Sequence, residues 1–490
     1  MLIETNLAAD PNCIVDAFRE IVGDAHVLTK SDDVAAYLTD WTGQYSSDAL
    51  AVVRPASTED VAALIKLCKE RNIAVVPQGG RTGLCGGGVP IEGRESVVVS
   101  LARMNAIRTL NPQGRTVIAE AGVILETLHE AALQEGSIHE EALGMIASAK
   151  RPLVLAGAGA VGAKDNLIAL SERLEAPLAT TLKGTGLFKG HPNNIGYFGT
   201  LSTAEAYDVI GVSNCVIVFG ALMHILTTDR GELLKGKRVI QVNNYTSDVG
   251  RFYQPDATLI ADAAQTADNF LYWLNEAEVA PSGFANELPS HDISVHPKGD
   301  PAKSMQGLIN LEYALDRLNE TLPEDRIMLT DGGCYITEVW CRVNVPDPNS
   351  FHMSDNFAAI GQGMQQAIGA AHGAPNRPVV LFMGEGGFMM GGTNEFNTAV
   401  RTNRDLIVII CNDSAYGAEH IQMLDRKMDP KLTEFDWPSF RDVANSLGGQ
   451  GVEVTSPEDL EVAIEAINAR KGPIIFELKL DPNNVPRMRI

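Results

Sequence analysis

Two acidic residues each follow an apolar segment in the C-terminal third of the sequence. Glu385 lies just after residues 379–383, and Asp413 lies just after residues 406–410. Such segments predict buried parallel strands, whose carboxyl ends meet at one sheet edge, where ligands bind. Because Mg²⁺ prefers oxygen ligands and commonly takes one or two carboxylates plus phosphate oxygens, the pattern predicts a divalent-ion site. Either residue alone would equally suit a solvated Glu or a turn Asp.

A glycine-rich segment near the N-terminus offers a second place for a phosphorylated ligand. Six glycines fall within residues 79–88, after the apolar segment 73–76 and between Pro77 and Pro90. Glycine permits positive φ and close approach, so successive N–H groups can converge on a diphosphate, and Thr82 adds a hydroxyl. A flexible exposed loop would show the same glycine content. The two prolines and the preceding strand favour an ordered loop.

A third glycine pattern, Gly157-Ala-Gly-Ala-Val-Gly162, follows the apolar segment 152–156. A strand followed by this pattern and a helix is the context of a dinucleotide-binding fingerprint. The carboxylate expected to bind the ribose is missing, because residues 179–181 are Ala-Thr-Thr. A tight turn between strand and helix is therefore at least as good an interpretation as a nucleotide site.

The elements that must position these residues alternate between strand and helix patterns. Ser57 begins a helical pattern with apolar residues at the spacing i, i+3, i+4, i+7, and the apolar segment 73–76 follows it as a strand. Similar alternation throughout the chain predicts an α/β architecture with several parallel sheets.

Composition and charge narrow the possible partners. The chain has 490 residues, enough for about three domains at ~150 residues each. Its formal charge of −23 repels nucleic acid and acidic membranes, and no apolar run approaches the ~18 residues of a membrane helix, so we expect neither partner. The N-terminus does not resemble a signal peptide, and seven cysteines without a CxxC pair suggest buried thiols. We therefore expect a cytoplasmic protein.

The sequence around the two acids resembles thiamine diphosphate-dependent enzymes of the acetolactate synthase and 2-oxo acid decarboxylase family. The similar segments are GEGGFMMGGTNEFNTAVR and VIICNDSAYG. The resemblance implies Mg²⁺ ligands at Glu385, Asp413 and the backbone of Ala415, with Asn412 as the alternative to Asp413, and cofactor contacts at Gly384, Gly386, Gly387, Ala415 and Tyr416. Glu385 stands where the family has Asp, which predicts weaker or altered metal binding.

A second segment of the same family surrounds Ile360 and Gly361. The sequence AIGQGM, followed by AIGAA, resembles the family segment whose bulky residue holds the cofactor in a bent shape. The resemblance implies that Ile360 has this role and that Gly361 also lies at the cofactor. A core isoleucine at a glycine-tight helix start would look the same in sequence.

The first two thirds of the chain carry two further resemblances. Segments within 137–275, such as AKRPLVLAGAGA and NCVIVFGA, resemble the central domain of the same family, which binds FAD or an adenine nucleotide in some members and is structural in others. Residues 1–136 resemble the start of the FAD-binding domain of the glycolate oxidase and D-lactate dehydrogenase family, through VVRPASTEDVAALIKLCKERNIAVVPQGGRTGLCGGGVP. This second resemblance makes FAD an alternative cofactor and implies diphosphate contacts from Gly79, Gly80, Arg81, Thr82, Gly83 and Gly86.

These observations together give the expected fold. We expect an α/β protein with two Rossmann-like doubly wound parallel-sheet domains: a central domain at 137–275 and a C-terminal domain at 305–490 that binds thiamine diphosphate and Mg²⁺. A linker at 276–304 would join them, and an N-terminal α+β partial FAD-binding subdomain would occupy 1–136.

The resemblance implies an enzyme that decarboxylates or carboligates a small-molecule 2-oxo acid as a homodimer or tetramer. In the family, a glutamate on a pyrimidine-binding domain activates the cofactor, and the flavin-like segment 1–136 stands where that domain normally lies. No residue is therefore assigned as catalytic. Three alternatives remain: a separate chain supplies the pyrimidine-binding domain; the protein is an FAD-dependent 2-hydroxy acid dehydrogenase; or it is a non-catalytic fusion product.

Overall fold

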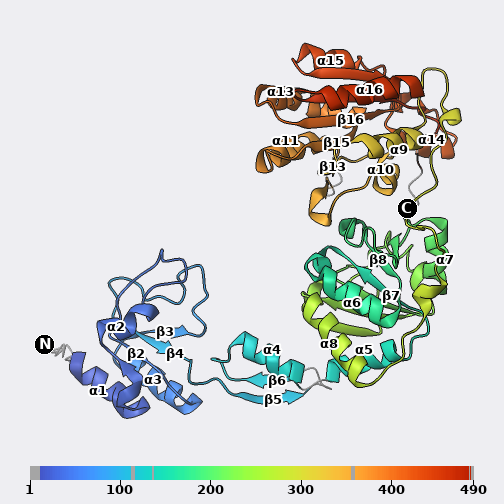
Figure 1. The fold of residues 1–490 in the computed structure, drawn as a ribbon. Helices are drawn as coiled ribbons and strands as arrows, with labels where there is room; N and C mark the ends of the chain where they lie inside the picture. Colours follow the sequence, from blue (N-terminus) through green and yellow to red (C-terminus); the bar gives the residue numbers. More distant parts are fainter. Residues whose placement is uncertain (1–10, 112–115, 135–136, 355–358, 485, 487–490) are drawn as a thin grey trace. The chain divides into compact units, whose positions relative to one another are not determined.

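The computed structural model describes residues 11–111, 116–134, 137–354, 359–484 and 486. The chain divides into two compact units, Met1–Glu140 and Glu141–Ile490. Figure 1 shows the course of the chain and labels its helices and strands.

The first unit contains a small mixed sheet with the strand order β1-β2-β4-β3. Its strands are β1 (Val27–Leu28), β2 (Ala51–Val53), β3 (Ala74–Gln78) and β4 (Ser96–Ser100), and its helices are α1 (Pro11–Val22), α2 (Ser31–Val34) and α3 (Thr58–Glu70). β1 is antiparallel to β2, while β2 and β3 run parallel to β4. The Ser57 side chain accepts a hydrogen bond from the Asp60 N–H and caps α3, as its sequence pattern predicts.

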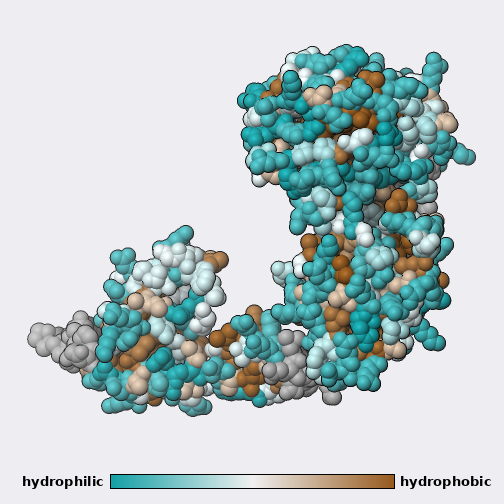
Figure 2. Space-filling view, in the orientation of Figure 1, coloured by the Kyte–Doolittle hydropathy of each residue, from teal (hydrophilic) through white to brown (hydrophobic). Residues whose placement is uncertain are grey.

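A separate two-stranded antiparallel sheet lies in the same unit. It consists of β5 (Ile107–Asn111) and β6 (Thr116–Ala119), and α4 (Leu125–Gln134) follows it. Apolar side chains here are exposed, among them Ile118 at 59% and Leu125 at 64%. Figure 2 shows hydrophobic residues at the surface over these elements. An isolated pair of strands is marginal in water.

The central part of the second unit is a six-stranded parallel sheet with the order β12-β11-β10-β7-β8-β9. Its strands are β7 (Pro152–Ala156), β8 (Leu178–Thr180), β9 (Asn194–Tyr197), β10 (Cys215–Phe219), β11 (Arg238–Asn243) and β12 (Ala257–Ile260). Its helices are α6 (Lys164–Leu174), α7 (Ala204–Val212), α8 (Ala263–Glu276) and the greater part of α5 (Ser137–Ala147), whose first residues belong to the first unit. Two buried apolar clusters, one with α5, α6 and α8 and one with α7, cover the two faces.

The C-terminal part is a second six-stranded parallel sheet, with the order β14-β13-β15-β16-β18-β17. Its strands are β13 (Ile327–Thr330), β14 (Phe351–Met353), β15 (Val379–Gly384), β16 (Leu406–Asn412), β17 (Gln450–Val454) and β18 (Ile474–Lys479). Its helices are α9 (Leu311–Thr321), α10 (Ile336–Arg342), α11 (Gly363–Gly373), α12 (Glu385–Gly387), α13 (Thr393–Arg401), α14 (Gly417–Asp425), α15 (Phe440–Ser446) and α16 (Pro457–Ala469).

Helices cover both faces of this sheet as well. One buried cluster contains α9, α10 and α16, and the other contains α11, α13 and α15. The two parallel sheets, each buried on both faces, confirm the prediction of two doubly wound α/β domains. The apolar segments predicted as strands at 152–156, 379–383 and 406–410 are β7, β15 and β16.

Two further expectations concern cysteines and membranes. Cys68, Cys215 and Cys411 are buried thiols, as predicted, and Cys334 and Cys341 are partly buried. The prediction is wrong for Cys13, which lies on an exposed side of α1, and for Cys85, which lies in the mostly exposed glycine-rich segment 79–88. No helix in the described ranges has both the length and the apolar character needed to span a bilayer.

Candidate cofactor and metal site

The two predicted acids follow adjacent strands of the C-terminal sheet. β15 and β16 are paired in parallel, with Gly384 opposite Cys411 at their carboxyl ends. Glu385 is the next residue after β15, and Asp413 is the next residue after β16. β13 is the first of these strands along the chain, and it pairs with β14 on one side and with β15 on the other. The order in which strands are added to the sheet therefore reverses between β13 and β15. Crevices at such positions are the usual ligand sites of doubly wound sheets.

The side chains of Glu385 and Asp413 meet. The Glu385 carboxyl donates a hydrogen bond to the Asp413 carboxylate, and the Ala415 N–H donates to Glu385 Oε1 and to Asp413 Oδ1, both at 3.0 Å. Burial, and then the charge of Asp413, raises the pKa of Glu385 to about 9. Burial also raises the pKa of Asp413 to about 6. At neutral pH the pair therefore holds a proton where a cation could sit.

The two carboxyl groups alone are too few ligands for a hard divalent ion, so other oxygen atoms must complete its coordination. No group of three or more His, Cys, Asp or Glu side chains suited to a metal is found within the described ranges. Mg²⁺ commonly combines one or two carboxylates with water and substrate phosphates. The two acids, one of them only 2% exposed, supply the negative charge, and the remaining oxygens would come from backbone, water and a diphosphate.

Asn412, the alternative ligand, is occupied by other partners. Its Nδ2 donates to Glu477 Oε1 at 2.7 Å, and its Oδ1 accepts from the Ser414 N–H at 2.9 Å. Both ends of the amide are thus committed at a residue that is 1% exposed. Geometry therefore favours Asp413 over Asn412 beside Glu385.

The glycines at the end of β15 and in the short helix α12 allow close packing. A Cβ on Gly386 would lie 2.5 Å from Tyr416 Cε1, so the tyrosine ring occupies the place of a side chain. The Tyr416 ring also packs on Phe435, at 4.5 Å between centroids, and its N–H donates to the Thr433 carbonyl. Gly384 is more open, since the nearest atom to a Cβ there is Tyr335 Cε1 at 3.5 Å.

The predicted cofactor-shaping residue, Ile360, lies on a turn beside the same loop. A Cβ on Gly332 would lie 3.0 Å from Ile360 Cγ2. Gly361 has φ +90°, and a Cβ there would lie 3.1 Å from the Gly387 carbonyl oxygen. The Ile360 turn and the segment Gly384–Gly387, which ends β15 and forms α12, are therefore in direct contact.

Asp331 is a buried site residue that the sequence interpretation missed. It follows β13, and its Oδ2 accepts a hydrogen bond of 2.6 Å from the Gly361 N–H. A Cβ on Gly387 would lie 2.5 Å from the same oxygen. The available signal was the sequence Thr330-Asp-Gly-Gly333, an acid and two glycines after an apolar segment, the same pattern that identified Glu385.

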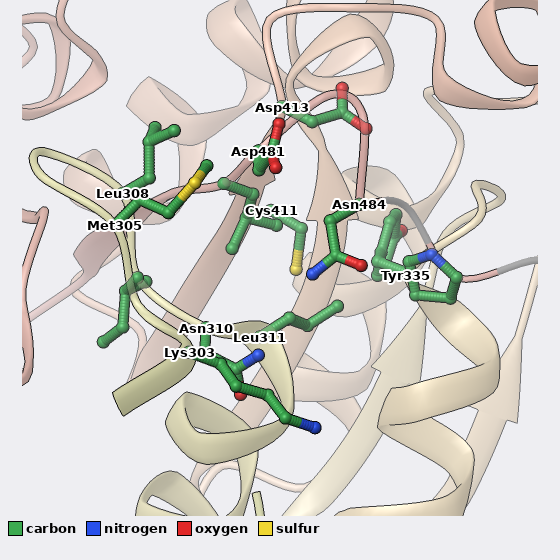
Figure 3. A pocket seen from close by; sticks show the side chains of 13 residues that line it. Lys303, Met305, Leu308, Asn310, Leu311, Tyr335, Cys411, Asp413, Asp481 and Asn484 are labelled. Atoms are coloured by element: carbon green, nitrogen blue, oxygen red, sulfur yellow. The ribbon is translucent and has the colours of Figure 1, made fainter. Parts of the chain in front are cut away.

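A cavity of about 120 Å³ adjoins the acidic pair. Figure 3 shows Asp413 and Asp481 on one wall, Asn484 and Tyr335 on another, and Lys303 opposite Asp413. The full lining is Lys303, Met305, Leu308, Ile309, Asn310, Leu311, Tyr335, Cys411, Asp413, Leu480, Asp481, Asn484 and Pro486. Asp413 thus faces both Glu385 and a space large enough for a few small groups.

The N-terminal glycine loop belongs to the first unit. Gly79, Gly80, Arg81, Thr82 and Gly83 are exposed, and Gly86 is partly buried. Arg81 donates to the Ala36 carbonyl at 2.6 Å and lies over the Tyr37 ring, so its guanidinium already has partners. Gly86 has φ +69° and packs against Tyr45.

The glycine fingerprint of the central sheet is explained by packing. A Cβ on Gly157 would lie 2.4 Å from the Gly220 carbonyl oxygen, and a Cβ on Gly159 would lie 3.0 Å from Gly220 Cα. The Gly159 N–H donates to the same carbonyl at 3.0 Å. The loop after β10 thus lies against these glycines, which supports the interpretation as a tight turn.

Comparisons with known proteins find three family models that match parts of the chain. Residues 331–478 match the thiamine pyrophosphate enzyme C-terminal TPP binding domain, residues 139–270 match the thiamine pyrophosphate enzyme central domain, and residues 49–163 match an FAD binding domain.

Curated relatives match at low identity. A probable 2-ketoarginine decarboxylase, AruI, of Pseudomonas aeruginosa is 27% identical over 339 residues, which cover 68% of this chain and 59% of that protein. A probable acetolactate synthase large subunit of Methanococcus aeolicus is 27% identical, covering 71% and 61%. The acetolactate synthase isozyme 1 large subunit of Escherichia coli is 26% identical, covering 71% and 62%. The chain thus spans about three fifths of the length of these relatives.

The C-terminal sheet, with the buried pair of Glu385 and Asp413 after two adjacent strands, belongs to a doubly wound α/β domain. Through its central and C-terminal domains the chain belongs to the thiamine pyrophosphate enzymes, and its N-terminal part carries an FAD binding domain. Thiamine pyrophosphate is the same compound as thiamine diphosphate. The resemblances seen in the sequence are therefore confirmed.

Proposed function

We propose that this chain binds thiamine diphosphate and Mg²⁺ at the carboxyl ends of β15 and β16. The observation that carries the proposal is the buried pair of Glu385 and Asp413, which shares a proton beside a glycine loop inside a domain of this family. Glu385, Asp413 and the Ala415 carbonyl would hold the ion, which would in turn bind the diphosphate.

The neighbouring loops would receive the rest of the cofactor. Gly384, which is only partly buried, would lie at the diphosphate, while Gly386 and Gly387 are buried and let Tyr416 and Asp331 pack close beside it. Ile360 and Gly361 would contact the thiazolium end. When bound, thiamine diphosphate supplies an electron sink for breaking or making the carbon–carbon bond next to a 2-oxo group.

The chain's own residues bind and orient rather than exchange protons with substrate in this proposal. The substrate class would be a small 2-oxo acid, and the reaction a decarboxylation or a carboligation. The names of the relatives, a decarboxylase and two acetolactate synthase subunits, support this class. A pyrimidine-binding domain from another polypeptide would complete the site, in at least a dimer. We propose a cytoplasmic location, which suits seven cysteines that are all free thiols.

A second candidate function rests on the first unit. The FAD binding domain match at 49–163 and the exposed glycine loop favour FAD as a ligand of an FAD-dependent 2-hydroxy acid dehydrogenase. Protein purified with a flavin absorption band would support this alternative, and colourless protein that takes up no added FAD would contradict it. A non-catalytic fusion product is the third alternative.

Equilibrium dialysis with radiolabelled thiamine diphosphate tests the leading proposal. We expect binding in Mg²⁺ and little binding in excess chelator. Equal binding in both conditions would contradict the metal site. No binding in either condition would contradict the proposal that the chain binds thiamine diphosphate. Turnover of pyruvate by the chain, with and without a pyrimidine-domain chain, then separates an enzyme that needs a partner from a non-catalytic binding protein.

A further inference from the structure

Asp331 lies between two loops of the candidate site. It is 1% exposed, and its N–H donates to the Phe382 carbonyl on the adjacent strand β15. Its position at the end of β13 is therefore fixed by the sheet. A buried carboxyl requires compensating hydrogen-bond donors, so the partners of this side chain show what it stabilises.

Those partners are backbone N–H groups of the Ile360 turn. Oδ2 accepts from the Gly361 N–H at 2.6 Å, and Oδ1 accepts from the Gly363 N–H at 3.3 Å. Gly363 begins α11, an 11-residue helix. The Asp331 carboxylate therefore caps the N-terminus of this helix, although Asp331 itself lies at the end of β13. The anion-binding end of α11 is therefore already occupied by a protein carboxylate.

The turn is also enclosed from its other side. A Cβ on Gly391 would lie 2.4 Å from the Gly361 carbonyl oxygen, and a Cβ on Gly387 would lie 2.5 Å from Asp331 Oδ2. The Gln365 side chain donates to the Gly391 carbonyl at 2.9 Å. Asp331 thus fixes the Ile360 turn against the segment 387–391. The two segments touch at glycines, so their backbones approach each other directly.

We propose that Asp331 is a positioning residue that sets the place of Ile360 relative to the segment Gly384–Gly387, at which the diphosphate would bind. The inference rests on the proposed function, because it concerns the thiazolium end of the same cofactor. In the proposed function the diphosphate end is held by Glu385 and Asp413, which share the Ala415 N–H as donor, whereas the Asp331 oxygens accept from the Gly361 and Gly363 N–H groups. Loss of Asp331 should therefore weaken binding of the whole cofactor more than binding of a diphosphate alone.

The test compares two ligands in Mg²⁺ by isothermal titration: thiamine diphosphate and inorganic pyrophosphate. Asp331→Asn keeps the size of the side chain, but one of the two accepting oxygens becomes an NH₂ group and the other becomes a weaker, uncharged acceptor. We expect its affinity for thiamine diphosphate to fall roughly tenfold more than its affinity for pyrophosphate, since hydrogen bonds to a charged group are lost. Ser456→Ala is the matched control, because it removes the cap of α16, where Ser456 Oγ accepts from the Asp459 N–H.

The outcomes separate the inference from the proposed function. Equal losses for both ligands, or a selective loss also in Ser456→Ala, would overturn the positioning role. Wild-type protein that binds neither ligand would overturn the proposed function itself. If Asp331→Asn does not fold, as judged by circular dichroism, the same two titrations are made with Gly363→Ala instead. Its Cβ would lie 2.9 Å from Asp331 Cβ and displace the turn while keeping the carboxylate, so it should reproduce the selective loss.

Discussion

The carboxyl group of Glu385 donates a hydrogen bond to the carboxylate of Asp413, from the loop after one strand to the loop after its parallel neighbour. Two buried acids that are hydrogen-bonded to each other cannot both ionise without a compensating charge. A proton supplies that charge in the protein alone, and a divalent cation would replace it. Each of the first two predictions below depends on this exchange.

The metal-free protein should lose stability as the pH rises. The folded pKa of Glu385 is about 9, above its ordinary 4.5, and that of Asp413 is about 6, above its ordinary 3.8. A raised pKa means that the folded state binds more protons, so this contribution is complete below pH 4 and is lost through 6 and then 9. Urea unfolding between pH 5 and 9 in chelator measures the effect. Saturating Mg²⁺ and thiamine diphosphate should flatten the profile, and a metal-free profile that rises over this range would contradict the shared proton.

Glu385→Gln should stabilise the metal-free protein at pH 8 and abolish its stabilisation by Mg²⁺ with cofactor. At pH 8 folding must add a proton to Glu385, whose folded pKa is about 9, whereas the amide fills the same space and needs no proton, so the gain should be roughly 1–3 kcal/mol. Thermal melts of wild type and variant, with and without Mg²⁺ and thiamine diphosphate, provide the measurement. An upward shift of the variant's melting temperature by Mg²⁺ equal to that of wild type would argue against Glu385 as a ligand.

Asp413→Asn and Asn412→Ala should have opposite consequences. Asp413→Asn should weaken Mg²⁺-dependent cofactor binding at least roughly tenfold with little cost in stability. Asn412→Ala removes the amide that donates to the buried Glu477, and should cost about 1–3 kcal/mol while leaving the metal affinity of the folded protein unchanged. Titration and urea unfolding of both variants decide the choice. The reverse pattern would make Asn412 the ligand.

Gly386→Ala should weaken cofactor binding, because its Cβ would lie 2.5 Å from Tyr416 Cε1 and move the ring. We expect a loss of roughly tenfold, as for a small displacement in a preorganised site. Gly369→Ala is the matched control, since a Cβ there, within α11, has no heavy atom within 4 Å. It should leave affinity unchanged and add up to about 1 kcal/mol of stability. Similar affinities of the two variants would contradict the role of the glycine loop.

The fold could be predicted from sequence because central strands of the two parallel sheets, such as β7, β10, β15 and β16, are continuous apolar segments. The same feature placed Glu385 and Asp413 at strand ends, while their role as metal ligands stays a prediction. From the sequence alone, the choice between Asp413 and Asn412 as the metal ligand stays open. That choice depends on Glu477, a residue 65 positions away whose contact with Asn412 no local pattern reveals.

Two other features lay beyond sequence reasoning for a related reason. Asp331 acts on a turn 30 positions away in the chain, so its partners appear only once β13 and β15 are paired. The glycines at 157 and 159 suit a nucleotide or a tight turn equally well until the loop at Gly220 is seen against them. In both cases the deciding contact joins segments that are distant in sequence.

The central claim is that Glu385 and Asp413 hold a divalent ion that binds the cofactor's diphosphate. Mn²⁺ in place of Mg²⁺ makes this directly measurable, because electron–nuclear double resonance detects phosphorus atoms coupled to a bound Mn²⁺. We predict phosphorus coupling in the wild-type complex with thiamine diphosphate, and no bound Mn²⁺ signal in the double variant Glu385→Gln, Asp413→Asn under the same conditions. Mn²⁺ that binds without phosphorus coupling, or that binds the double variant equally well, would contradict the account.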